Sequence, residues 1–221
     1  MNVLLAVFWK DLVTEWRGRD RAVSMLLFAL LVVVVFHFAL PGGATRQTRE
    51  LAPGLLWIAY VFAAVLGLNR AFSVELENDA LTGLALVPTD RGWIFLGKAA
   101  ASFVILGVVQ VLTAAVFAIV FDVGGWGALG PLAGIVALGS IGLCSIGTLF
   151  GAVAVRTRFR EVMLPLLLLP LLIPVVSGSV RATGELMRTG QVSFEPIQLL
   201  IVADAIYLIA SFVGFEYVLD E

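Results

Sequence analysis

The chain has 221 residues, of which 61% are hydrophobic and 14% are charged, and its formal net charge is −2. Soluble proteins are typically about 45–50% apolar and roughly 25% charged, and nucleic-acid-binding domains carry a basic excess, so this composition argues against both classes. The apolar residues gather in long runs. Because a chain in lipid must satisfy its own backbone groups, these runs predict an all-α integral membrane protein.

Residues 1–20 predict a helix that lies in the membrane interface, with apolar side chains on one face and charged ones on the other. The apolar positions are Leu5, Phe8, Trp9, Leu12, Val13 and Trp16. A simple extension of the first span is the alternative, but seven charged residues between Lys10 and Arg21 argue against immersion. No small-residue cleavage site follows, so we expect the first apolar run to be retained.

Six apolar segments follow, each long enough to cross the ~30 Å hydrocarbon core as a helix. They are Arg21–Leu40, Leu51–Leu68, Gly97–Phe121, Gly127–Val155, Val162–Gly178 and Ile197–Tyr217. The Lys and Arg residues divide ten to four between the two sides, the four being Arg46, Arg49, Arg181 and Arg188. The positive-inside rule therefore predicts that both termini are cytoplasmic.

The connection between the second and third spans predicts a cytoplasmic helix at about residues 72–87, which Pro88 ends. Its apolar side chains share one stripe, and its acidic residues lie on neighbouring faces. The stripe is Phe72, Leu76, Ala80 and Leu84, and the acidic residues are Glu75, Glu77 and Asp79. An exposed apolar stripe of this kind requires the membrane or a partner protein to cover it.

The fifth span contains Pro165, Pro170 and Pro174, each of which removes a helical hydrogen bond. We therefore expect a kinked or broken helix, which could be a bent packing element or a moving hinge. Residues 179–196 mix apolar and charged side chains, which suggests short helices on the outer membrane surface.

The stretch Gly92–Lys98 has the spacing G-x-x-x-x-G-K of a phosphate-binding loop. Ala99 stands where the magnesium-binding Ser or Thr belongs, and bulky residues fill the loop. We therefore expect no nucleotide site in this chain, so that any ATP is bound by another chain. Lys98 is better interpreted as an anchor of the third span at the membrane interface.

The acidic residues Glu75, Glu77 and Asp79 raise a metal-site hypothesis, but on an unbroken helix Glu77 points away from the other two. A polar face for a partner is the favoured interpretation. The single histidine, His37, is a candidate haem ligand without a second ligand at helical spacing, so we expect no directly bound metal or cofactor. Intramembrane Asp204 is consistent with an interior position, a subunit contact, or an ion pair with Arg181 or Arg188. No catalytic set of residues is present in the sequence.

Several stretches of this sequence together resemble the CcmB family, the membrane subunits of the cytochrome c biogenesis ABC system. They are Ala52-Pro-Gly-Leu-Leu-Trp57, Asn69-Arg-Ala-Phe72, Glu75-Leu-Glu77, Leu84-Ala-Leu-Val-Pro88, Leu96-Gly-Lys98 and the proline-punctuated run Leu164–Pro174. Ala80-Leu-Thr82 departs from the family pattern Gly-x-Leu-Glu, so no glutamate role carries over to this position.

The resemblance implies a permease of the ABC exporter type (ABC-2-like) in the bacterial inner membrane. It would form a homodimer that pairs with two copies of a CcmA-like ATPase and associates with CcmC-, CcmD- and CcmE-like proteins. ATP hydrolysis by the partner would drive release of the haem-loaded chaperone, and haem would be a handled ligand. Residues 72–87 would then be the coupling helix that docks on the ATPase. Two alternatives are a metal-dependent membrane enzyme using Glu75, Glu77 and Asp79, and a passive assembly subunit.

Overall fold

The computed structural model describes residues 3–40, 46–77, 90–121, 129–155 and 160–220. These residues form eight α-helices, with no strand among them, which confirms the all-α fold class. The helices are α1 (Val3–Gly18), α2 (Asp20–Ala39), α3 (Arg46–Glu77), α5 (Arg91–Val120), α6 (Leu129–Val155), α7 (Arg160–Leu171), α8 (Ile173–Thr189) and α9 (Phe194–Asp220).

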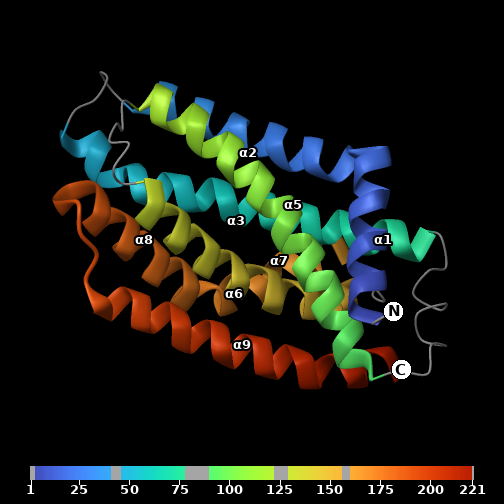
Figure 1. Cartoon of the computed structure of the whole chain (residues 1–221). Helices are drawn as coiled ribbons and strands as arrows, with labels where there is room; N and C mark the ends of the chain where they lie inside the picture. Colours follow the sequence, from blue (N-terminus) through green and yellow to red (C-terminus); the bar gives the residue numbers. More distant parts are fainter. Residues whose placement is uncertain (1–2, 41–45, 78–89, 122–128, 156–159, 221) are drawn as a thin grey trace.

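Most of the helices run side by side in one elongated bundle, with both ends of the chain at the same end of it (Figure 1). Within the described residues, α2, α3, α5, α6 and α9 are each long and apolar enough to cross a membrane. The bent pair α7 and α8 makes a sixth span if it is counted as one. Large apolar side chains also cover the outside of the bundle, for example Leu27, Ile119 and Ile209 at 64%, 81% and 65% exposure. This apolar outer surface is suited to contact with lipid. Together with the apolar spans, it identifies the chain as a multi-pass membrane protein.

The bend between α7 and α8 measures 59° and lies at Leu172. Pro174 stands at the start of α8 and has no N–H to donate to the turn before it, whereas Pro165 and Pro170 lie inside α7. The Tyr207 hydroxyl of α9 donates a hydrogen bond to the Leu171 carbonyl, which the bend leaves without its usual helical partner. The helix α8 then continues to Thr189, so the short surface helices expected for residues 179–196 are wrong.

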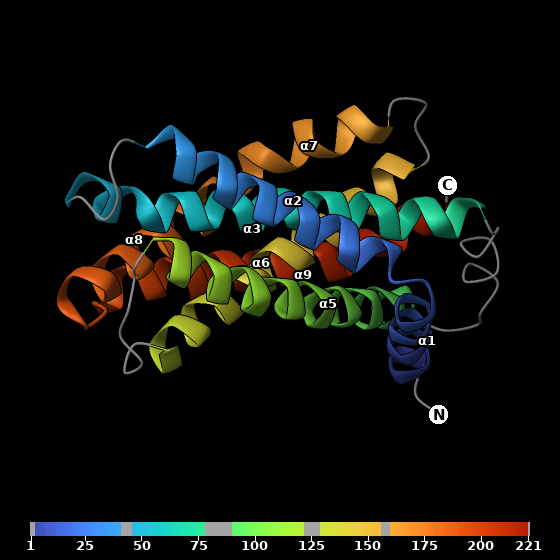
Figure 2. The ribbon, with the colours of Figure 1, turned by 90° about the horizontal axis from the view of Figure 1, so that it is seen from above.

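The helix α1 lies across the end of the bundle, in a different direction from the long helices, as the two views show together (Figures 1 and 2). It packs on α5 at Gly97, where an added Cβ would lie 2.8 Å from the Leu4 carbonyl oxygen and 3.0 Å from Val7 Cβ. Glycine therefore permits this close approach. Trp9 and Trp16 remain exposed on the far side of α1, a position suited to the headgroup region of a bilayer.

The helix α3 corrects the predicted boundary of the second span. It runs without a break from Arg46 to Glu77, so no separate helix begins at Phe72. The sequence Asn69-Arg-Ala contains neither glycine nor proline to interrupt it, which explains why the span continues. Residues 78–87, the larger part of the predicted coupling helix, lie outside the described residues.

Candidate functional site

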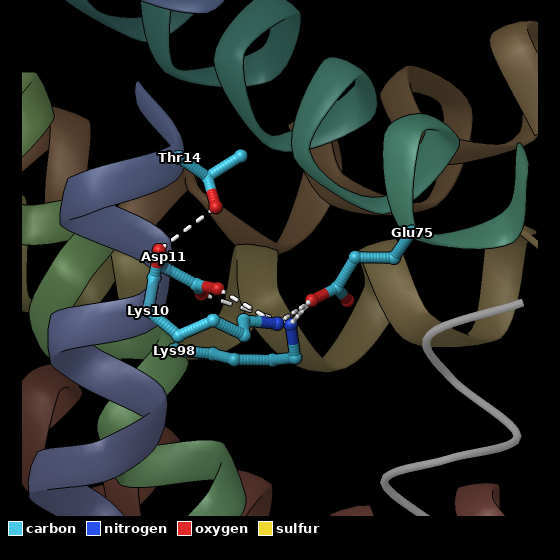
Figure 3. A network of polar contacts seen from close by, with 5 residues as sticks. All are labelled: Lys10, Asp11, Thr14, Glu75 and Lys98. Atoms are coloured by element: carbon cyan, nitrogen blue, oxygen red, sulfur yellow. Dashed lines mark hydrogen bonds and ion pairs between the residues drawn. The ribbon is translucent and has the colours of Figure 1, made fainter. Parts of the chain in front are cut away.

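Four charged side chains from three helices meet at the end of the bundle that carries both termini (Figure 3). Lys10 and Asp11 come from α1, Glu75 from the last turn of α3, and Lys98 from α5. Glu75 Oε1 accepts a hydrogen bond from Lys10 Nζ at 2.7 Å and also forms an ion pair with Lys98 Nζ. Asp11 completes the set, with Oδ1 3.0 Å from Lys10 Nζ and Oδ2 3.7 Å from Lys98 Nζ. We call these four residues the α1–α3–α5 ion cluster.

Most of the ion cluster is withdrawn from solvent. The side chains of Lys98 and Glu75 are 6% and 9% exposed, whereas that of Lys10 is 42% exposed. Burial lowers the pKa of Lys10, but the negative charges of Asp11 and Glu75 outweigh this effect, so its pKa lies above the usual value. Two ammonium groups face two carboxylates, so the charges balance, as buried ionic groups require.

The Phe72 ring packs under the cluster, with Lys98 Nζ 5.2 Å from the ring centroid. Phe72 is only 3% exposed, because Gly151 of α6 leaves room for its ring. The expected exposed stripe is therefore wrong at Phe72, and Glu75 likewise faces the bundle interior rather than a partner. Leu76 is 41% exposed and points outward. The side chains of Glu77, Asp79 and Leu84 lie outside the part of the chain whose side chains the structure describes.

The expectation for Lys98 as an interface anchor is also wrong, since its ammonium group is buried in the ion cluster. Sequence reasoning missed the cluster because Lys10 and Lys98 are far from Glu75 along the chain. The residues Gly92–Lys98 form the first two turns of α5, and Asp90 Oδ1 caps that helix by accepting from the Gly92 N–H at 2.9 Å. A helix here leaves no loop to wrap around a phosphate.

A tight turn fixes the angle between α1 and α2. Arg19 adopts the left-handed backbone conformation with φ of 58°. Glu15 Oε1 accepts a hydrogen bond from the Ala22 N–H at 2.8 Å and so satisfies one free donor at the start of α2. These contacts join the ion cluster to the first span as well as to the second and third.

The other predicted residues lie apart from the cluster. His37 is exposed near the far end of α2, with its ring edge-on to Phe38 and Phe121 at centroid distances of 5.5 and 6.1 Å. Asp204 is 6% exposed and lies against Gly142 of α6, and neither of its carboxylate oxygens has a hydrogen-bond partner among the described residues. Of the three positions considered for Asp204, the structure therefore favours the bundle interior.

Polar side chains also join the spans deep in the bundle. Trp57 Nε1 donates to Thr183 Oγ1 at 3.0 Å, which ties α3 to α8. The Tyr60 hydroxyl donates to the Gln110 carbonyl oxygen at 3.0 Å, and Ser140 Oγ donates to Gln110 Oε1 at 2.9 Å. These bonds link α3, α5 and α6, and they contain no acid–base pair placed for catalysis.

The ion cluster ties the ends of three helices together through shared charges. Within the described residues, no group of three or more His, Cys, Asp or Glu side chains could hold a metal ion. The two lysine ammonium groups occupy the positions around Glu75 Oε1 that a cation would take. Glu75 therefore joins the last turn of α3 to both α1 and α5.

Comparison with known proteins gives the family. A family model described as "CcmB protein" matches residues 2–214. The chain belongs to the CcmB family. This finding confirms the resemblance carried by the segments between Ala52 and Lys98 and by the proline-rich fifth span.

Several similar proteins match this chain along most of their length. "Heme exporter protein B" of Paracoccus denitrificans is 30% identical over 204 residues, which covers 92% of this chain and 90% of that protein. The protein of the same name from Rhodobacter capsulatus is 31% identical over 165 residues, covering 75% and 73%. That from Bradyrhizobium diazoefficiens is 27% identical over 210 residues, covering 95% and 93%.

Proposed function

We propose that this chain is the permease subunit of an ABC-type complex for cytochrome c maturation. It works as a homodimer with a separate CcmA-like ATPase dimer, beside CcmC-, CcmD- and CcmE-like proteins. ATP hydrolysis in the partner drives haem handling and release of the haem-loaded chaperone, and this chain performs no catalysis. The match to the CcmB model over residues 2–214 carries the proposal, and the exporter names of the relatives support it.

The end of the bundle with both termini is the side that meets the ATPase. Ten of the fourteen Lys and Arg residues belong to this side by the predicted topology, which supports a cytoplasmic location in the bacterial inner membrane. The helix α3 ends here at Glu77, next to the segment that resembles the coupling helix of the family. Leu76 is exposed at this end and forms, with Leu84, the apolar contact to the ATPase.

The ion cluster provides a route for the coupling. Movement of residues 78–87 against the ATPase shifts the last turn of α3, where Glu75 holds Lys10 and Lys98. The interfacial helix α1 and the third span α5 then move with α3. The bundle responds between two arrangements rather than continuously, as packed interiors generally do.

Affinity purification from native membranes tests the proposal. The tagged chain is expected to bring an ATP-hydrolysing protein with it, and Leu76→Asp combined with Leu84→Asp is expected to remove that protein from the eluate. Leu129→Asp is the matched control, because Leu129 is 53% exposed at the start of α6, at the opposite end of the bundle. Wild-type recovery of the ATPase with the double variant would count against docking at this site.

A further inference from the structure

The buried carboxyl group of Asp204 lies where α9 meets both α6 and the first turn of α8. A Cβ atom added at Gly142 of α6 would lie 2.7 Å from Val175 Cγ2 and closer still to Asp204 Oδ1, so only glycine leaves room for this contact. Asp204 is 6% exposed and Val175 is fully buried. The carboxyl group therefore belongs to the interior of the bundle, whatever surrounds the bundle.

Neither α6 nor α8 presents a charge to this carboxyl group within the described residues. Helix α6 contains no Asp, Glu, Lys, Arg or His, and its one titratable side chain, Cys144, lies two residues after Gly142 and so on the opposite side of the helix. On α8 the first charged residue after Val175 is Arg181, which lies on a different face of that helix and is exposed. The contacts that α6 and α8 make with Asp204 are therefore with uncharged groups.

The helices α5 and α9 supply no counter-charge in the described part of the chain either. The two charged residues of α5 lie toward the end of the bundle with the termini. Arg91 donates a hydrogen bond to the Glu216 carbonyl oxygen at 3.4 Å, and Lys98 is held in the ion cluster. On α9 the titratable neighbour is Tyr207, one turn away, whose hydroxyl donates to the Leu171 carbonyl. Neither oxygen of the carboxyl group has a hydrogen-bond partner among the described residues.

An ionised carboxylate buried without a counter-charge or a hydrogen bond is strongly disfavoured, whereas the neutral acid is tolerated. The neutral acid is therefore the form that suits the observed arrangement. Val175, against which it packs, lies just after the bend at Leu172. Tyr207, one turn along α9, bonds the Leu171 carbonyl just before the bend. Two neighbouring side chains of α9 thus contact both sides of the bend.

We propose that Asp204 is a proton-binding site that controls the bend between α7 and α8. With its proton bound, the neutral carboxyl group packs between Gly142 and Val175, and the bend is held at 59°. When the O–H bond breaks, the proton passes to water and the electron pair stays on the carboxylate, whose charge draws it away from its apolar neighbours. The first turn of α8 then separates from α9, and the hydrogen bond from Tyr207 is lost. The site requires neither an ATPase nor a second copy of the chain, so it does not depend on the proposed function.

Infrared spectroscopy of the full chain in lipid nanodiscs tests whether Asp204 holds a proton. The difference spectrum between the wild-type chain and Asp204→Asn at neutral pH is expected to show the carbonyl band of a protonated carboxylic acid. Above the titration midpoint this band should fall about tenfold for each pH unit, as the carboxylate band appears. A carboxylate band alone at neutral pH would overturn the inference.

The uncharged variants also test the protonation state through folding. Asp204→Asn keeps the size of the side chain and removes its charge, so it is expected to fold at neutral pH as the wild-type chain does. Asp204→Leu is a second uncharged variant of similar size, which replaces Asp204→Asn in the measurements if only Asp204→Leu folds. Failure of both variants to fold would mean that the site requires the ionised group, and it would overturn the inference.

Spin labels on the two sides of the contact test the control of the bend. They are placed at Ile173→Cys on α8 and Ile209→Cys on α9 in a Cys144→Ser background, because Ile173 and Ile209 are 64% and 65% exposed. Pulsed electron paramagnetic resonance then measures the distance between the labels as the pH is raised. The distance is expected to lengthen with the same midpoint pH as the loss of the infrared band. An unchanged distance would overturn the inference.

Two variants assign this response to one side chain. Asp204→Asn is expected to abolish the change in distance. A change caused by ionisation of Tyr207 would persist in that variant, and such persistence would overturn the inference. Asp20→Asn is the matched control, because the Asp20 side chain is 75% exposed. It is expected to keep the wild-type response, and loss of the response in this control would assign the titration elsewhere and overturn the inference as well.

Discussion

Replacing Glu75 by glutamine removes the carboxylate that Lys10 and Lys98 share. Removing one partner of a buried ion pair typically costs about 3–5 kcal/mol, because the remaining charge stays buried without compensation. Two features reduce the cost here. Lys10 is 42% exposed and can turn toward water, and Asp11 Oδ2 stays 3.7 Å from Lys98 Nζ. We therefore expect Glu75→Gln to destabilise the bundle by about 2–4 kcal/mol.

The measurement is equilibrium unfolding of the purified chain in mixed micelles with increasing SDS. The double variant Glu75→Gln/Lys98→Met removes both charges and is expected to cost about 2 kcal/mol less than the sum of the single variants. Asp20→Asn is the control: Asp20 Oδ2 lies 3.9 Å from Arg70 Nη2, and these side chains are 75% and 47% exposed. The Asp20→Asn substitution should lower the free energy of unfolding by less than about 1 kcal/mol, because this ion pair is exposed to solvent. If Glu75→Gln were no more destabilising than Asp20→Asn, the ion cluster would not hold these helices together.

Gly142→Ala is expected to destabilise the α6–α9 contact by about 1–3 kcal/mol, since the new Cβ would lie 2.4 Å from Asp204 Oδ1. Thermal unfolding measures this effect. The control is Gly134→Ala, which should be neutral or slightly stabilising because no atom lies within 4 Å of its Cβ position. Equal effects at the two sites would refute the close contact at Gly142. Tyr207→Phe removes the hydroxyl that donates to the Leu171 carbonyl at the bend. It is expected to cost about 1–2 kcal/mol and to speed amide exchange in α8, and unchanged exchange would mean that the bend does not need this bond.

The sequence located the helices well because each apolar run is long and bounded by charged residues, glycine or proline. The interfacial helix followed from a helical repeat of apolar side chains in residues 1–20, and the structure has a separate helix at Val3–Gly18. The broken fifth span followed from three prolines, although the sequence could not show that the bend falls at Leu172.

The stripe of Phe72, Leu76, Ala80 and Leu84 shows where such reasoning stops. Helical spacing identifies side chains that share a face, but it does not say what covers that face. The glycine that receives Phe72 lies on α6, and the lysines that neutralise Glu75 come from α1 and α5, all distant along the chain. Phe72 and Glu75 are therefore buried in the chain's own bundle, a placement that depends on tertiary packing alone.

Cross-linking from Leu76 tests most directly whether this end of the bundle meets an ATPase. A cysteine is placed at Leu76 in a Cys144→Ser background, and a second variant carries it at Leu129, at the opposite end. In native membranes treated with a bifunctional thiol-to-amine reagent, we expect an adduct with an ATP-binding protein at Leu76 and none at Leu129. If the ATPase is present in those membranes but forms no adduct at Leu76, this end of the bundle does not meet it. Equal adducts at Leu76 and Leu129 would contradict the proposed docking site as well.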